Sequence, residues 1–255
     1  MTPCTAVVLA GSRPGVDSFA KAYVTDLKAL IPIGGVPMVR RPVDALLAST
    51  GIDSIRVLTQ QPDRIAGALP DDDRISVEAS GATIASTLEA MCADPSVHWP
   101  VLVTTADHAL LTTDMIADFL GKASGADVAI GVVSSEALFN RLPQSKRTWL
   151  KFRGGAYSGA NLFLLGGPHV RPAVEVWRAS EQNRKKSWRL MLTLGFSGLL
   201  GAVLRLRTLQ QTLDAVGKKL DLTLRAVELA EPLAAVDVDK PADHELVTAI
   251  LEGRA

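Results

Sequence analysis

The strongest constraint on the fold of this chain is a short apolar run at residues 4–10 that leads directly into a glycine-rich loop. A buried strand that ends in glycine lets backbone N–H groups approach phosphate oxygens closely. Basic side chains near such a loop neutralise charge on a transferring phosphate. The spacing matches neither the P-loop nor the dinucleotide-binding fingerprint. We therefore predict a nucleoside triphosphate site that includes Leu9, Ala10, Gly11, Ser12, Arg13 and Lys28.

Apolar runs of strand length alternate with helical patterns through the first half of the chain. This alternation is typical of βαβ units and predicts a mostly parallel sheet between layers of helices. A length of 255 residues with 47% hydrophobic residues is enough for one large α/β domain over 1–255. We predict strands at 4–10, 54–59, 74–79, 100–105, 126–133 and 233–238. A final helix is predicted from Pro241, with Leu246, Val247, Ile250 and Leu251 facing inward.

Acidic residues follow or line two of the predicted strands. Asp107 comes after the strand at 100–105, at the carboxyl end where open α/β sheets bind ligands. Asp237 and Asp239 are two residues apart and would point to the same side of the strand at 233–238. Carboxylates placed together repel one another unless a cation lies between them. We therefore predict Mg²⁺ ligands among Asp107, Asp237 and Asp239; capping of a turn by Asp107 or of the final helix by Asp239 is the structural alternative.

Two further segments carry groups that suit substrate contacts. Gly81 and Thr83 follow the third predicted strand, where a base can lie against the backbone; a capped helix start is the alternative. Lys151 and Arg153 are two residues apart, so an extended segment would point both toward an acceptor phosphate. A solvated basic face is the alternative there. These two residues belong to a basic cluster of Arg141, Lys146, Arg147, Lys151 and Arg153.

Four motifs, taken together and in this order, resemble those of a known enzyme family. The stretch from Val7 to Met38 carries Leu-Ala-Gly, an Arg, Lys-x-Leu and Gly-x-Pro-Met, and the other motifs lie at 105–111, 158–161 and 237–243. The pattern is similar to that of the MobA-like nucleotidyltransferases, which include molybdenum cofactor guanylyl- and cytidylyltransferases, and to that of sugar-1-phosphate nucleotidyltransferases. The chain departs from the family pattern at Ser12, where a second glycine or alanine is usual.

The resemblance implies a Rossmann-like α/β/α fold of the nucleotide-diphospho-sugar transferase type. It also implies a Mg²⁺-dependent enzyme that transfers a nucleoside monophosphate from a triphosphate, preferably CTP or GTP, to a small phosphorylated acceptor and releases pyrophosphate. A molybdopterin acceptor is the more familiar outcome in the family, whereas a phosphorylated alcohol or lipid precursor would suit the apolar insertion at 187–226, and a sugar phosphate is the third choice. It favours Asp239 as the second metal ligand and places the acceptor near Ser158, Gly159 and Asn161. A non-catalytic nucleotide-binding module and a glycosyltransferase of related fold are the alternatives.

Charge and cysteine content bear on partners and location. Lys and Arg together number 27, and so do Asp and Glu, so no overall field points to nucleic acid as a partner. The 2 cysteines have no metal-binding spacing and suit the reducing cytoplasm, where we expect the protein. The first apolar run is typical of a strand rather than of a signal peptide.

Residues 187–226 depart most from compact members of the family, and we predict a helical insertion there. The run from Leu190 to Leu204 contains no charged residue, yet it is shorter than the about 20 apolar residues that a spanning helix needs. We expect this run to pack within the protein. A homodimer interface, the wall of an acceptor pocket and a membrane-surface element stay open as alternatives, and peripheral membrane contact is the less favoured of them.

Overall fold

The computed structural model describes residues 3–11, 18–23, 25–81, 83–182 and 206–255. Within these residues one mixed sheet contains eight strands, β1 (Cys4–Leu9), β4 (Ile52–Thr59), β5 (Ile75–Ala79), β6 (Val101–Thr105), β7 (Val128–Ser134), β8 (Leu150–Phe152), β9 (Gly155–Leu165) and β10 (Leu224–Glu228). Their order is β10-β7-β9-β6-β1-β4-β5, and β8 pairs with β9. Among the described strands of this sheet, only β9 and its hairpin partner β8 break the parallel arrangement.

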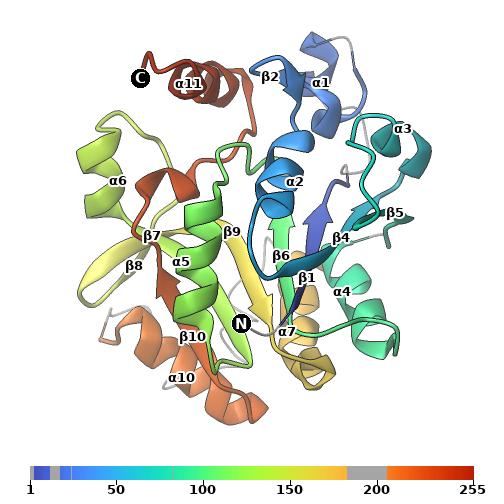
Figure 1. The fold of residues 1–255 in the computed structure, drawn as a ribbon. Coiled ribbons are helices and arrows are strands. Elements are labelled where there is room, and N and C mark those ends of the chain that lie inside the picture. The colour runs from blue at the N-terminus through green and yellow to red at the C-terminus, as the bar shows by residue number, and fades with distance from the viewer. Residues whose placement is uncertain (1–2, 12–17, 24, 82, 183–205) are drawn as a thin grey trace.

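Helices cover both faces of this sheet (Figure 1). The α-helices are α1 (Ser18–Ala22), α2 (Arg40–Leu47), α3 (Pro62–Ala66), α4 (Ile84–Ala93), α5 (Thr113–Ala123), α6 (Ser135–Arg141), α7 (Arg171–Gln182), α10 (Leu209–Leu220) and α11 (Pro241–Leu251). Short 3-10 helices are η1 (Lys28–Leu30), η2 (Pro168–Val170) and η4 (Pro232–Ala235), and a small hairpin joins β2 (Pro32–Ile33) to β3 (Val36–Pro37).

Alternating side chains of the central strands build a core on each face of the sheet. In β1, Ala6 and Val8 belong to a buried cluster that includes residues of α2 and α5, whereas Val7 belongs to a second cluster with residues of α4 and α7. In β6, Leu102 belongs to the first cluster and Val103 to the second. Because neighbouring side chains of a strand point to opposite faces, strands covered on both faces are apolar throughout. The predicted three-layer, mostly parallel α/β/α architecture is confirmed.

The predicted strand at 233–238 is wrong. Pro232–Ala235 forms η4, and the chain then crosses the carboxyl edge of the sheet in an extended segment, 236–239, that pairs with no described strand. Pro232 has no N–H group to donate to a ladder, and the sheet edge beside β7 is occupied by β10, a strand that the sequence does not predict. A backbone hydrogen bond of 3.1 Å from Val238 N–H to the Asp107 carbonyl oxygen holds the crossing segment in place.

The predicted final helix begins at Pro241, as expected, and forms α11. Val247 is fully buried in it, and Leu246 and Ile250 pack against the core in part. Leu251, which we expected to face inward, is instead 37% exposed. It is the last helical residue, where the chain leaves the core, so the buried stripe of α11 is shorter than predicted.

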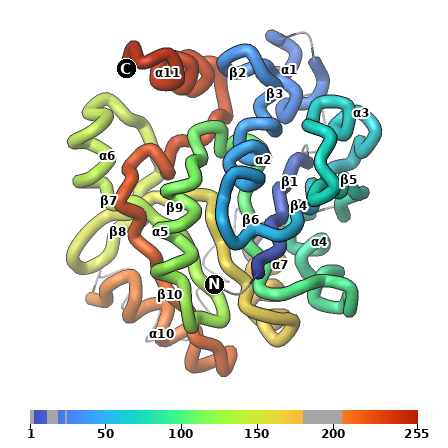
Figure 2. The backbone as a smooth tube through the Cα atoms, in the orientation of Figure 1, coloured from blue at the N-terminus to red at the C-terminus, as the bar shows by residue number. Residues whose placement is uncertain are grey.

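The interval 187–226 is described in part. Residues 187–205, which contain the run from Leu190 to Leu204, lie outside the described residues. The remainder forms α10, which begins with a capping box between Thr208 and Gln211, and enters β10 at Leu224. Figure 2 shows α10 beside β10, at the end of the molecule opposite to α11. Among the described residues, no helix has the length and apolar character needed to cross a membrane.

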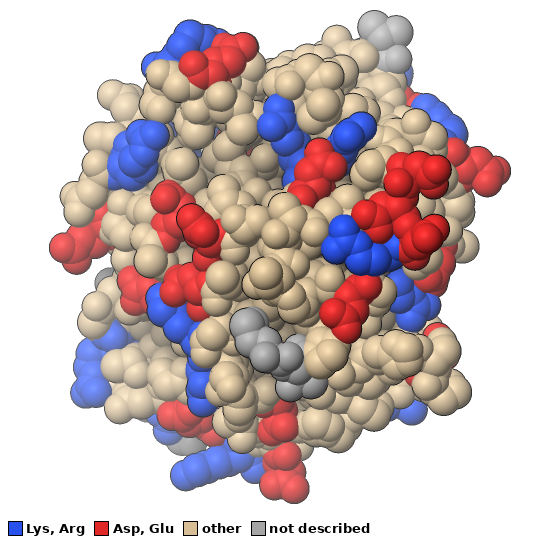
Figure 3. All heavy atoms as spheres, viewed as in Figure 1, with Lys and Arg blue, Asp and Glu red and all other residues tan. Residues whose placement is uncertain are grey.

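Charged side chains are mixed in sign on the face of the molecule shown in Figure 3, where acidic and basic groups alternate with uncharged surface. This matches the equal numbers of acidic and basic residues in the chain. A charged ligand on this face would therefore be recognised by a local arrangement of groups and not by one broad field.

Gly217 in α10, with Gly121 in α5 as its control, tests how closely α10 approaches the segment that leads into β10. A Cβ added to Gly217 in α10 would lie 2.3 Å from the Leu222 carbonyl oxygen, whereas one added to Gly121 in α5 would meet no atom within 4 Å. We expect Gly217→Ala to lower the free energy of unfolding by about 1–3 kcal/mol through overpacking. Gly121→Ala should raise it by up to about 1 kcal/mol through helix propensity. Urea unfolding followed by circular dichroism measures both, and equal effects would contradict the close approach at Gly217.

Candidate active site

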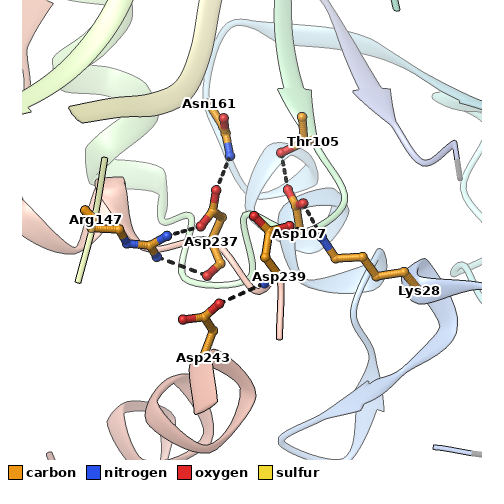
Figure 4. A network of polar contacts seen from close by, with 8 residues as sticks. All are labelled: Lys28, Thr105, Asp107, Arg147, Asn161, Asp237, Asp239 and Asp243. Carbon is orange, nitrogen blue, oxygen red and sulfur yellow. Dashed lines mark hydrogen bonds and ion pairs between the residues drawn. The ribbon is translucent and has the colours of Figure 1, made fainter. Parts of the chain in front are cut away.

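A lysine ammonium lies between two carboxylates at the carboxyl edge of the sheet (Figure 4). Lys28 Nζ is 2.7 Å from Asp107 Oδ2 and 2.5 Å from Asp239 Oδ1. The side chains of Lys28 and Asp107 are 21% and 22% exposed, while that of Asp239 is 63% exposed and faces solvent. The three residues come from η1, the end of β6 and the segment before α11. Three predicted site residues that are far apart in the sequence therefore meet at one point.

The end of β6 fixes the position of Asp107. Thr105, the last residue of the strand, donates from Oγ1 to Asp107 Oδ1 at 2.5 Å. The Asp107 carbonyl oxygen accepts the hydrogen bond from Val238, so the crossing segment is attached to the same residue. The next residue, His108, is fully buried, and this burial lowers the pKa of its ring to about 4. The imidazole beside Asp107 is therefore neutral at physiological pH and adds no charge to the site.

Arg147 and Asn161 surround the other acid of the crossing segment. Arg147 donates from Nη1 to Asp237 Oδ1 and from Nη2 to the Asp237 carbonyl oxygen, the latter at 3.0 Å. Asn161 Nδ2 donates to Asp237 Oδ2 at 3.3 Å. Asn161 has a φ of +48° and lies where the pairing of β9 with β7 shifts register between Ile130 and Val132. A bulge of this kind re-aims a side chain, here toward the carboxyl edge.

Three carboxylates and two cations share this edge. Burial by itself would lower the pKa of Lys28, but the charges and hydrogen bonds of Asp107 and Asp239 outweigh it, and the pKa is raised. Burial raises the pKa of Asp237; the charges of Asp107 and Asp239 act in the same direction, and Arg147 opposes them. Lys28 is therefore charged at neutral pH. When all five groups are ionised, the cluster carries one excess negative charge.

The predicted phosphate loop is described only at its start. The structure includes Leu9, Ala10 and Gly11, while Ser12 and Arg13 lie outside the described residues. A Cβ added to Gly11 would lie 2.9 Å from the side-chain amide nitrogen of Gln60. The absence of a side chain at Gly11 thus lets the residue that follows β4 approach the end of β1 closely.

Gly81 and Thr83 form the start of α4. Thr83 Oγ1 accepts from the Ser86 N–H at 3.1 Å, and Ser86 Oγ accepts from the Thr83 N–H at 3.0 Å, which together make a capping box. The Gly81 N–H donates to Thr87 Oγ1 at 3.0 Å. This is the geometry of the capped-helix alternative. Contact of Gly81 and Thr83 with a base stays a prediction, because a cap and a base contact do not exclude each other.

The residues predicted to bind the acceptor lie on β8 and β9. Lys151 is exposed in β8, but Arg153 lies in the turn after this strand, and its guanidinium reaches Gln211 Oε1 at 3.4 Å. The two side chains therefore do not share a strand, contrary to the inference from their spacing. Ser158 is buried and Gly159 is exposed, both in β9. An acceptor clamp formed by these residues stays a prediction.

Arg147 is a site residue that the sequence alone does not single out. It is one of five basic residues between 141 and 153, and no spacing distinguishes it from its neighbours. Its partner Asp237 is 90 positions away, so the contact depends on how the loop before β8 meets the crossing segment. Nothing in the local pattern of charge therefore marks Arg147 as a site residue.

Comparison with known proteins identifies the family of this chain. The model of the MobA-like NTP transferase domain matches residues 6–195. The chain belongs to this family. No curated protein sequence matches the transferase, but several solved structures do.

A hypothetical transferase from Thermus thermophilus is 29% identical to this transferase, with a TM-score of 0.79, and the match covers 96% of this chain and 100% of that chain. A 4-diphosphocytidyl-2C-methyl-D-erythritol synthase from Anaerococcus prevotii is 12% identical, with a TM-score of 0.63 and coverage of 98% and 96%. A homolog of Mycobacterium tuberculosis rv0371c from Mycobacterium sp. strain JC1 is 15% identical, with a TM-score of 0.56 and coverage of 99% and 98%. The last two likenesses show the fold alone.

The family and the fold together make this protein a nucleotidyltransferase of Rossmann-like architecture. Its substrates are, in general terms, a nucleoside triphosphate and a phosphorylated acceptor. The predicted family and enzyme class are thereby confirmed.

Loss of the Lys28 charge should impair nucleotidyl transfer strongly. We expect Lys28→Ala to lower kcat by roughly 100-fold or more, because a preorganised charged contact to a transferring phosphate contributes about 3–4 kcal/mol. Lys122→Ala is the matched control, since Lys122 is an exposed lysine that pairs with Asp118 on α5. Steady-state pyrophosphate release and thermal unfolding should be measured on both variants. A folded Lys28→Ala protein with unchanged kcat would contradict the role of Lys28.

Proposed function

We propose that this transferase uses Mg²⁺ to move the nucleoside monophosphate of CTP or GTP onto a small phosphorylated or lipid-precursor acceptor, with release of pyrophosphate. The observation that carries the proposal is the convergence of Asp107 and Asp239 on Lys28 Nζ at 2.7 and 2.5 Å. These groups lie where the parallel strands end, which is the edge at which open α/β sheets bind their ligands.

The proposed reaction is an in-line displacement. An oxygen of the acceptor phosphate forms a bond to the α-phosphorus, and the bond from that phosphorus to the bridging oxygen breaks, so pyrophosphate leaves with the electron pair. The attacking phosphate is already ionised, so no general base is required. Lys28 offsets charge on the leaving pyrophosphate, and Arg13 is proposed to act with it from the glycine loop.

The donor set at the edge fits Mg²⁺. This ion is usually held by one or two carboxylates together with substrate phosphates and waters, and Asp107 and Asp239 already converge on one cation, the Lys28 ammonium. These two residues would hold the ion, which when bound supplies neutralisation of phosphate charge. Asp237 is less suited, because its carboxylate is paired with Arg147 and not with the Lys28 ammonium that Asp107 and Asp239 share. Among the residues that the structure describes, no group of three or more His, Cys, Asp or Glu side chains is placed to hold a metal ion.

A pyrophosphate-release screen tests the reaction. The four nucleoside triphosphates are each combined with Mg²⁺ and a panel of phosphorylated alcohols, sugars and lipid precursors, and one pair should release pyrophosphate well above the others. Chelation of the metal by EDTA should abolish this release, and added Mg²⁺ should restore it. Tight nucleotide binding without release for any acceptor would contradict the proposed reaction.

The metal assignment predicts a selective loss of affinity. Asp107→Asn and Asp239→Asn should each weaken binding of the Mg²⁺–nucleotide complex by at least roughly 10- to 100-fold. Loss of a residue that only hydrogen-bonds to a metal ligand already lowers metal affinity by this factor. Metal-free nucleotide should bind these variants at least as tightly as it binds the unaltered protein, because each substitution removes one carboxylate that repels the triphosphate. Asp53→Asn is the matched control, because Asp53 is an exposed carboxylate on β4. Titration calorimetry with and without Mg²⁺ measures these affinities, and equal losses in both conditions would exclude direct ligation.

A further inference from the structure

Arg147 is a nearly buried cation at the substrate edge to which the proposed reaction assigns no role. Its side chain is only 14% exposed, and that of its partner Asp237 is 25% exposed. Two of the five N–H groups of the guanidinium donate to Asp237. In the part of the chain that the structure describes, no hydrogen bond is made by the other three. A planar group with donors to spare suits a phosphate, which accepts two parallel hydrogen bonds.

The position of Arg147 matches what in-line transfer requires. The incoming phosphate and the leaving pyrophosphate must lie on opposite sides of the α-phosphorus. Figure 4 shows Lys28 on one side of the three carboxylates and Arg147 on the other. Lys28 comes from η1, which follows the glycine loop, so its side is the side of the triphosphate. Arg147 and Asn161 then face the side from which the acceptor enters.

Asn161, the second hydrogen-bond partner of the Asp237 side chain, has an uncommon backbone conformation. The φ of this residue is +48°, in the bulge of β9. Such a conformation is uncommon for residues other than glycine and is concentrated at ligand sites. The bulge fixes Asp237 from one side while Arg147 fixes it from the other. Asp237 is thus held as an acceptor for the guanidinium.

We infer that Arg147 binds the phosphate group of the acceptor, and that Asp237 holds the guanidinium in place for this phosphate. The inference rests on the proposed function, because it assigns a residue to the acceptor of that reaction. The ligand class is a phosphate monoester dianion. The dianion binds the three N–H groups that Asp237 leaves free, and the negative charge of the nearby Asp237 carboxylate opposes its own.

Inorganic phosphate is the probe for this site. Its binding is measured by ³¹P NMR titration of the full chain, saturated with Mg²⁺ and an α,β-methylene analogue of CTP or GTP. We expect Arg147→Ala to weaken phosphate binding by about 10-fold or more, the equivalent of one charged hydrogen bond. Arg147→Lys should lie between the two, since lysine keeps the charge and loses the fork. Arg141→Ala is the matched control, because this arginine of the same basic cluster donates to the Ala255 carbonyl oxygen instead.

Substitution of Asp237 should change phosphate affinity in the opposite direction to substitution of Arg147. A merely structural ion pair would not behave in this way. Asp237→Asn removes the opposing charge and should tighten phosphate binding, whereas a structural pair would lose affinity whichever partner is changed. If Arg147→Ala fails to fold, the double variant Arg147→Ala with Asp237→Asn removes both charges and should lack the tightening seen in Asp237→Asn alone. Equal phosphate affinity in Arg147→Ala and the unaltered protein, or no phosphate binding by the latter, would overturn the inference.

Nucleotide binding separates this inference from the proposed function. Affinity for the Mg²⁺–nucleotide analogue should fall by a smaller factor in Arg147→Ala than phosphate affinity does, because for the nucleotide only the general charge of the edge changes. A loss of nucleotide affinity at least as large as the loss of phosphate affinity would place Arg147 on the triphosphate and overturn the acceptor assignment, while leaving nucleotidyl transfer intact. Failure of the unaltered protein to bind any nucleotide would instead reject the proposed function, whatever the phosphate titration shows.

Discussion

Three carboxylates lie together at one edge of this sheet because Lys28 and Arg147 neutralise them. Without these cations, Asp107, Asp237 and Asp239 would repel one another in a partly buried setting, where charges are screened poorly. Each cation comes from a different part of the chain, and each binds a carboxylate about 80 or more positions away. The site therefore exists only in the folded protein. The ion pairs make the crossing segment at 236–239 part of the site even though it belongs to no strand.

Contacts around α11 tie the two ends of the chain to this edge. His244 lies in the first turn of α11, five residues after Asp239, and hydrogen-bonds through Nε2 to the Pro32 carbonyl oxygen at 2.7 Å. Its ring also lies 4.6 Å from that of Tyr23, just after α1. Because a carbonyl oxygen only accepts, Nε2 carries the proton. One histidine thus joins the segment that follows Lys28, the helix that follows the glycine loop and the segment that carries Asp239.

Local patterns predict part of this arrangement and fail at identifiable points. The central strands β1 and β6 are largely apolar runs, as expected for strands that are buried on both faces, so the length of each run was sufficient to predict them. The segment before Asp239 is also apolar and was therefore predicted as a strand. The edge of the sheet beside β7 can pair with only one segment, however, and β10 occupies it. The spacing of Lys151 and Arg153 misleads because the strand ends between them, before a turn in which Gly154 has a φ of +93°. Arg147 carries no local signal, since its partner is remote.

The charge balance gives a physical reason for metal and nucleotide to bind together in the proposed reaction. With all groups ionised, the five side chains at the edge carry one excess negative charge, so a bare triphosphate meets net repulsion from them. A divalent cation between Asp107 and Asp239 would reverse the sign of the cluster. The triphosphate would then be attracted by the same residues that otherwise repel it. The acids are thus unfavourable for the nucleotide alone and favourable for the metal–nucleotide complex, which makes this edge selective for substrate that arrives with its cation.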